Sequence, residues 1–301
     1  MPLLKVLILA IVQGLAELLP VSSSAHVVVA EKLLHLDPSS PEMTLLLVML
    51  HTGTMFAVIV YFWKQWGRSY FATGDAFKRF AIRAIAATAL TGIIGYPLQK
   101  IIAKLAFPNA PKAQIEDLFG RLDLVAYALF AVGLLILWAG LKERSAAKSE
   151  APDYARSVTR SGDNVTFAQA NWMGAIQGLS LPFRGFSRSG STISGGLLAG
   201  ATRERAERFS FALAVILTPA VVGREALRLL HASKEATAAG TPIDLHGSIV
   251  GALLGMVFAF FAGLAGLRWL SSWLESGKWY LFGVYCLVAS IAVFYLHTIG
   301  Y

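Results

Sequence analysis

The chain has 301 residues, of which 56% are hydrophobic and only 15% charged, which excludes an ordinary soluble α/β enzyme, since soluble domains are about 25% charged. The formal net charge of +8 does not indicate a nucleic-acid partner, because the Lys and Arg residues gather in loops between apolar runs, as the positive-inside rule describes. The single Cys286 excludes a disulfide framework and a cysteine metal site.

Two apolar segments are interrupted by polar residues. Residues 6–34 contain Glu17, Pro20 and a serine run, and residues 171–200 contain the stretch SLPFRGFSRSGS. Each segment reads as two half-helices joined by a polar turn, and each half is too short to cross a bilayer. Non-helical backbone at membrane depth needs protein or a water-filled cavity around it. Both segments are therefore predicted to be re-entrant hairpins that enter and leave on the same side.

Six other apolar runs are long enough to cross a hydrocarbon core of about 30 Å as helices. They cover residues 43–63, 80–100, 124–141, 209–230, 247–267 and 279–301. The polar segment 142–169 is predicted to be a cytoplasmic linker between the third and fourth runs. The expected fold is an all-α polytopic membrane protein that forms a single integral membrane domain over residues 1–301.

The two halves of the chain resemble each other. The sequence VQGL at 12–15 is echoed by IQGL at 176–179, and each is followed by a proline and a serine-rich turn. The order of one hairpin and three spans occurs twice, in repeat 1 (about 1–141) and repeat 2 (about 170–301). An odd number of crossings per repeat predicts that the second copy is inverted, and paired interrupted segments of this kind indicate a site at the membrane midplane.

The distribution of basic residues predicts the orientation. Lys and Arg are more numerous on the face that carries the segments 64–83 and 142–160. That face is expected to be cytoplasmic. Both termini are then expected on the opposite face.

The first hairpin carries acidic and amide side chains. Gln13 and Glu17 are spaced i, i+4, so on a helix they project from one face. A carboxylate within the membrane is costly and indicates function, although a Glu that caps a neighbouring helix or pairs for folding is the alternative.

The turn of the first hairpin carries a hydroxyl and an imidazole. Pro20 can end the first half-helix, and Ser22 or Ser23 can cap the second. Ser23 and His26 then lie i, i+3 on one turn, where they can act as nucleophile and base. Capping without catalysis is the alternative.

The second hairpin supplies positive charge. Arg188 lies in the sequence FSRSG at 186–190, before a second half-helix. Its guanidinium offers a planar fork of donors for phosphate oxygens, and a helix N-terminus also favours an anion. A structural ion pair with Glu17 is the alternative. Brought together at the midplane, the two hairpins fit a phosphorylated lipid and phosphoryl transfer.

At these residues the sequence resembles the undecaprenyl-diphosphatase, or bacitracin-resistance, family of bacteria. That family has an E/Q-x-x-x-E pair followed by P-V-S-S-x-x-H, matched here by QGLAE at 13–17 and PVSSSAH at 20–26. Its later P-G-x-S-R-S-G run is matched by GFSRSG at 185–190, except that Phe183 and Arg184 separate Pro182 from Gly185.

The resemblance implies roles for individual residues. Ser23 would be the nucleophile and His26 its acid/base partner, while Glu17, assisted by Gln13, would be catalytic or would hold a divalent cation, Mg²⁺ or Ca²⁺. Arg188 would bind the diphosphate. Further residues expected around the substrate are Ser22, Ser187, Ser189, Gly190 and, as a hypothesis prompted by the altered turn, Arg184.

The resemblance also implies the reaction and its place. The family cleaves undecaprenyl diphosphate to undecaprenyl phosphate and inorganic phosphate, which recycles the lipid carrier of peptidoglycan synthesis and confers bacitracin resistance. It is an inner-membrane, multi-pass enzyme whose site opens to the periplasm. With the richer basic face cytoplasmic, both termini are expected to be periplasmic. The partners are then the lipid substrate and the bilayer, and a homodimer is left open.

One alternative function and the role of one further residue stay open. A lipid-phosphate flippase or transporter could also be built on inverted repeats with broken helices, but simple transport would not need a Ser23/His26 pair. His51, in the span after the first hairpin, either lines the cavity or hydrogen-bonds Thr52 or Thr54. It is left out of the catalytic set.

Overall fold

The structure, a computed structural model, describes residues 2–17, 19–38, 40–108, 115–148, 164–238, 244–274 and 278–301. These residues form helices and connecting turns, without a strand among them. The elements are α1 (Leu3–Ala16), α2 (Ser23–Leu33), α3 (Pro41–Ser69), α4 (Gly74–Ala106), the 3-10 helix η1 (Ile115–Leu118), α5 (Leu122–Lys148), α7 (Phe167–Ser180), α8 (Arg188–Leu198), α9 (Arg203–Ala238), α10 (Leu245–Leu274) and α11 (Trp279–Thr298).

The described residues include 6 helices that are long and apolar enough to cross a membrane. They are α3, α4, α5, α9, α10 and α11, and they coincide with the six predicted spans. Large apolar side chains on them point outward, for example Ile85 and Ile291, each 70% exposed. Such apolar surface fits lipid as the solvent. The prediction of an all-α polytopic membrane protein is confirmed.

The prediction for the linker was partly wrong. Helix α5 does not end near residue 141 but continues to Lys148, because the sequence LKERSAAK at its end consists mostly of good helix formers. Helix α7 begins at Phe167 with a capping box, in which Thr166 and Gln169 each satisfy the other's backbone N–H. The middle of the predicted linker, residues 149–163, lies outside the described residues.

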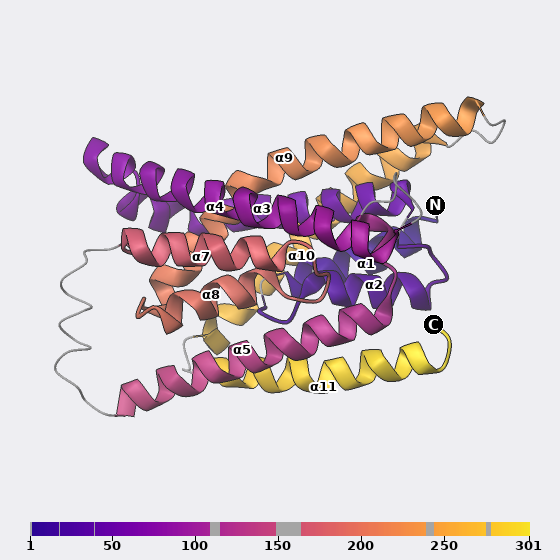
Figure 1. Ribbon diagram of the computed structural model, residues 1–301. Coiled ribbons are helices and arrows are strands. Elements are labelled where there is room, and N and C mark those ends of the chain that lie inside the picture. The colour runs from indigo at the N-terminus through magenta and orange to yellow at the C-terminus, as the bar shows by residue number, and fades with distance from the viewer. Residues whose placement is uncertain are drawn as a thin grey trace.

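Both interrupted segments form pairs of short helices, as predicted. In Figure 1, α1 begins and α2 ends near the N-terminus, whereas α7 begins and α8 ends toward the opposite end of the long helices. In each pair the two outer helix ends therefore lie at the same end of the bundle, and the connecting turn lies inside the bundle. The inverted symmetry of the two complete halves stays a prediction.

The first helix of each hairpin packs on a long helix of the other half of the chain. Helix α1 contacts α10, and α7 contacts α4. Glycines permit this approach: a Cβ on Gly14 would lie 2.4 Å from the Cβ of Ala262, and one on Gly178 would lie 2.9 Å from the carbonyl oxygen of Thr91. Small residues at helix contacts have this effect in membranes. The two hairpins are thus fixed against opposite halves and meet at their turns.

Candidate active site

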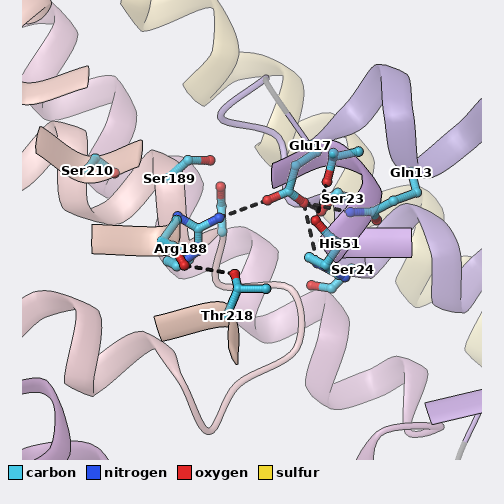
Figure 2. A network of polar contacts seen from close by, with 12 residues as sticks. Gln13, Glu17, Ser23, Ser24, His51, Arg188, Ser189, Ser210 and Thr218 are labelled. Carbon is cyan, nitrogen blue, oxygen red and sulfur yellow. Dashed lines mark hydrogen bonds and ion pairs between the residues drawn. The ribbon is translucent and has the colours of Figure 1, made fainter. Parts of the chain in front are cut away.

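The carboxylate of Glu17 lies at the centre of a network of polar contacts. Glu17 directly follows α1 and is only 4% exposed. Its Oε2 accepts hydrogen bonds from Ser23 Oγ at 2.5 Å and from Gln13 Nε2 at 2.7 Å, and its Oε1 accepts from Arg188 Nη2 at 2.8 Å. Figure 2 shows Arg188 on one side of the carboxylate and Gln13 and Ser23 on the other. A buried charge of this kind is tolerated because it is paired and hydrogen-bonded.

His51 is a further member of this network that the sequence analysis left out. Its Nε2 lies 3.3 Å from Glu17 Oε2, and its Nδ1 lies 2.8 Å from the backbone carbonyl oxygen of Leu47, one turn earlier in α3. Because α3 contacts α1, a residue from a fourth helix reaches the carboxylate, beside those from α1, α2 and α8. The only available signal was an ionisable residue within an apolar span, which indicates function.

Both short helices that follow the turns begin at a serine with unusual backbone geometry. Ser22 has φ 67° and Ser187 has φ 44°, and L-residues with side chains rarely adopt such positive values. The hydroxyl of Ser22 accepts from the backbone N–H of Ala25, and that of Ser187 accepts from Gly190. The prediction that Ser22 or Ser23 caps the second half-helix is confirmed for Ser22. The N-terminal, partly positive ends of α2 and α8 therefore lie at the two turns.

The two turns are in direct contact. An added Cβ on Gly190 would lie 3.0 Å from the carbonyl oxygen of Pro20 in the first hairpin. The absence of a side chain at Gly190 therefore allows the backbones of the two hairpins to approach each other. Ser189 is buried, and its carbonyl oxygen accepts from the Thr192 hydroxyl at 3.3 Å.

A cavity of about 240 Å³ lies beside the network. Its polar lining residues are Ser24, His51, Ser180, Arg184, Ser187, Arg188 and Thr218. The guanidinium carbon of Arg184 lies 4.0 Å from the ring centre of Phe119, which also lines the cavity. Two guanidinium groups on one cavity of this size can receive a compact, multiply charged anion.

Ser23 and His26, which were predicted to act as nucleophile and base, are not hydrogen-bonded to each other within the described residues. His26 lies one turn after Ser23 in α2, as predicted. Its Nδ1, however, lies 2.8 Å from the carbonyl oxygen of Ser22, and its Nε2 lies 2.6 Å from the hydroxyl oxygen of Tyr285. The reason is that α2 turns this side chain toward α11, where its ring stacks on Tyr285 with centres 5.8 Å apart.

His26 and Tyr285 line a second cavity of about 480 Å³. Most of its other lining residues are apolar: Val12, Leu15, Ala16, Leu19, Val21, Leu281 and Phe282, with Lys278 as the charged exception. The start of α2 therefore contributes to both cavities: Ser24 lines the first, whose wall combines polar and apolar residues, and His26 lines the second, which is mostly apolar. This arrangement suits a substrate with a polar head and a long apolar remainder.

The fold and the site together define a multi-pass membrane protein with a buried centre of polar and charged groups at the junction of two short hairpins. Comparison with known proteins agrees: the family described as "Bacitracin resistance protein BacA" matches residues 6–292. The chain belongs to this family.

Individual relatives match along nearly the whole chain. It is 52% identical over 290 residues to a protein of Acinetobacter baylyi named undecaprenyl-diphosphatase 2, covering 96% of each chain. It is 33% identical over 296 residues to a protein of that name in Burkholderia orbicola, covering 94% of this chain and 92% of the relative. An undecaprenyl-diphosphatase of Desulfatibacillum aliphaticivorans is 33% identical over 309 residues, covering 96% and 97%.

Proposed function

We propose that this protein hydrolyses undecaprenyl diphosphate to undecaprenyl phosphate and inorganic phosphate, recycling the lipid carrier of cell-wall synthesis and contributing to bacitracin resistance. The relatives named undecaprenyl-diphosphatase support the substrate. The single observation that carries the proposal is the chain of contacts from the Ser23 hydroxyl to Glu17 and from Glu17 to Arg188. A nucleophile, a base and a phosphate-binding cation are thereby joined in one buried cluster.

In the first step the Ser23 Oγ attacks the terminal phosphorus. The Oγ–P bond forms, the bridging P–O bond breaks, and undecaprenyl phosphate leaves. The hydroxyl proton passes to Glu17 Oε2, which already accepts it in a hydrogen bond of 2.5 Å. Arg188 moves from Glu17 to the phosphoryl oxygens and stabilises their charge, which is the main task of a phosphoryl-transfer site. The leaving group is a phosphate monoester, so a strong general acid is unnecessary.

In the second step water attacks the phosphorus of phospho-Ser23. The proton of the water passes to His26, and the proton on Glu17 returns to the serine oxygen as the P–Oγ bond breaks. This role requires the His26 ring to leave Tyr285, because His26 Nε2 is hydrogen-bonded to the Tyr285 hydroxyl at 2.6 Å. The position of His26 one turn after Ser23 in α2 supports the proposed role, because residues three apart on a helix are neighbours on its surface.

The divalent cation that the resemblance implies fits residues of this site. Gln13 Oε1 is buried and makes no hydrogen bond within the described residues, and together with Glu17 it would hold Mg²⁺ or Ca²⁺ through oxygen ligands. No group of three His, Cys, Asp or Glu residues that could hold a metal occurs in the described part of the chain. Phosphate oxygens and water would therefore complete the coordination. When bound, the ion would neutralise charge on the diphosphate.

The proposal includes the location. The resemblance to the family supports the bacterial inner membrane and an active site open to the periplasm, and the distribution of basic loop residues supports periplasmic termini. Labelling of cysteines introduced at Lys78 and Asp244, in a Cys286→Ser background, tests this orientation. Labelling of Asp244→Cys but not of Lys78→Cys from the periplasm is expected. A homodimer is testable by chemical cross-linking of the protein in membranes.

The decisive experiment measures inorganic phosphate released from undecaprenyl diphosphate by the purified protein in liposomes, with and without a chelator. Wild-type protein should release phosphate, Ser23→Ala should not, and chelation should lower the rate. Transfer of the lipid between leaflets without phosphate release would instead support the flippase alternative.

A further inference from the structure

The apolar cavity of about 480 Å³ lies between the first hairpin and the last helix. Its lining residues come from the first hairpin, among them Leu15 and Leu19, and from the start of α11, among them Leu281 and Phe282. Leu15 and Leu281 are 43% and 41% exposed, so the two walls continue onto the outer surface, which faces lipid. An apolar cavity that is reached from the lipid suits the polyprenyl chain of the substrate.

A hydrogen bond joins the two walls of this cavity. His26 belongs to the first hairpin and Tyr285 to α11, and both residues line the cavity. The Tyr285 hydroxyl oxygen lies 2.6 Å from His26 Nε2, and the two rings are stacked. A weaker contact between the same elements runs from the Cys286 thiol to the Pro20 carbonyl oxygen at 3.6 Å. Helix α11 packs chiefly on α5 rather than on the hairpin, so the walls can separate when these contacts break.

The same hydrogen bond occupies the basic nitrogen of His26. Its Nδ1 lies 2.8 Å from the backbone carbonyl oxygen of Ser22, and a carbonyl oxygen can only accept. In the neutral ring Nδ1 therefore carries the proton, and the lone pair of Nε2 accepts from the Tyr285 hydroxyl. Nε2 is thus the atom that would take the proton of water in the proposed second step, and it is held by Tyr285.

We propose that Tyr285 is a specificity-determining residue that keeps His26 out of the reaction until the polyprenyl chain of the substrate enters the cavity. A chain that enters between the first hairpin and α11 separates the two walls and breaks the hydrogen bond between them. Part of the binding energy of the chain is then used to release His26. The inference rests on the proposed function, and it requires the lipid monophosphate to stay in the cavity while water attacks phospho-Ser23.

Two diphosphates that differ in chain length test this role: farnesyl diphosphate and dimethylallyl diphosphate, which has a single isoprene unit. Tyr285→Phe keeps the ring that stacks on His26 and removes the hydroxyl. For dimethylallyl diphosphate, kcat should rise about 3- to 10-fold, the effect of removing one hydrogen bond. For farnesyl diphosphate, the same factor should appear as a lower KM, because the chain no longer has to break that bond. Tyr295→Phe, at a 62% exposed position of the same helix, is the matched control.

Farnesol supplies the chain without the phosphates. It should raise kcat for dimethylallyl diphosphate in the wild-type protein and should not do so in Tyr285→Phe. A double-mutant cycle shows whether Tyr285 acts through His26. In the His26→Ala background, Tyr285→Phe should have no effect on either substrate.

A lower kcat for both substrates in Tyr285→Phe would overturn the proposal, because Tyr285 would then support the reaction rather than restrain it. Unchanged kinetics in Tyr285→Phe, which would result from bilayer lipid that already fills the cavity, would also overturn it. So would a wild-type kcat that farnesol does not raise. A wild-type protein that releases no phosphate would instead contradict the proposed function. Photolabelling by a diazirine analogue of farnesol would still test the cavity, since labelling away from Leu281 and Phe282 would exclude it as the site of the chain.

Discussion

Ser23 and Glu17 are joined by a hydrogen bond of 2.5 Å from the serine hydroxyl to the carboxylate. The two residues lie on opposite sides of the turn that interrupts the first apolar segment. The turn therefore brings the proposed nucleophile next to the group proposed as its base. The contact requires the helix to be broken between the two residues, since residues six apart on one continuous helix are not neighbours.

Replacement of Glu17 tests its role as the proton acceptor. Glu17→Gln keeps the shape of the side chain but removes the base and the partner of Arg188, so kcat for phosphate release should fall by roughly 10² to 10⁴-fold. The melting temperature should also fall, because the buried Arg188 loses its counter-ion. Glu204→Gln, at an exposed position in the first turn of α9, is the control. A Glu17→Gln protein with wild-type kcat would exclude the role.

Removal of the Ser23 hydroxyl tests nucleophilic attack. Ser23→Ala should lose nearly all phosphate release, because among the described residues Ser23 is the one hydroxyl hydrogen-bonded to Glu17, and an adjacent base is what activates a serine nucleophile. Ser290→Ala, which removes a hydroxyl that donates a hydrogen bond to the Leu287 carbonyl oxygen in α11, should leave the rate unchanged. Substantial activity in Ser23→Ala would show that water attacks the diphosphate directly.

Replacement of His26 distinguishes the two chemical steps. If His26 accepts the proton of water, His26→Ala should slow hydrolysis of phospho-Ser23 by roughly 10² to 10⁴-fold and leave the first step faster than the second. Phosphate from terminally labelled substrate should then accumulate on the protein after acid quenching. The same label should be absent in His26→Ala/Ser23→Ala. Loss of activity without labelled protein would contradict this division of roles.

His51 is expected to orient Glu17. His51→Leu removes the group that lies 3.3 Å from Glu17 Oε2, and kcat should fall about 10-fold, since partners that orient a functional side chain typically contribute 10 to 100-fold. KM should change little, and His51→Gln should recover part of the rate through its amide N–H. An equal loss in His51→Leu and His51→Gln would indicate a packing role. Steady-state kinetics on the purified proteins separates these outcomes.

The contact of α3 with α10 gives a prediction for stability. A Cβ on Gly53 would lie 2.1 Å from the carbonyl oxygen of Met256, whereas a Cβ on Gly67, in the same helix, would meet nothing within 4 Å. Gly53→Ala should therefore destabilise the protein by about 1–3 kcal/mol through overpacking. Gly67→Ala should stabilise it by up to about 1 kcal/mol through helix propensity. Thermal unfolding in detergent compares the two, and equal melting temperatures would contradict the close approach.

The sequence was sufficient for the main features of the fold because they depend on local properties. Long apolar runs identify the six spans, since only a helix satisfies its backbone in lipid. Pro20 and the serine runs identify the interrupted segments. Helix α5 extends past its apolar run to Lys148, because its end is defined by helix propensity rather than hydropathy. That boundary was mispredicted.

Much of the candidate site was also indicated by spacing. Glu17 and Arg188 were predicted to be functional because charges within apolar segments are costly, and Ser23 because Glu17 and His26 lie near it in the sequence. Their roles in catalysis stay predictions. The contacts among them could not be derived, because residues 17 and 188 belong to different hairpins and meet only through the packing of α1 and α7 on the opposite halves of the chain.

The sequence by itself determined that two broken helices carry an acid, hydroxyls, histidine and arginine into a membrane domain, because composition and spacing are properties of single segments. Only the tertiary structure decided which groups meet. It joined Ser23 to Glu17 rather than to His26, directed His26 to Tyr285, and brought His51 to the carboxylate. The physical reason is that side-chain direction depends on the rotation of each helix about its axis, and packing against distant helices fixes that rotation.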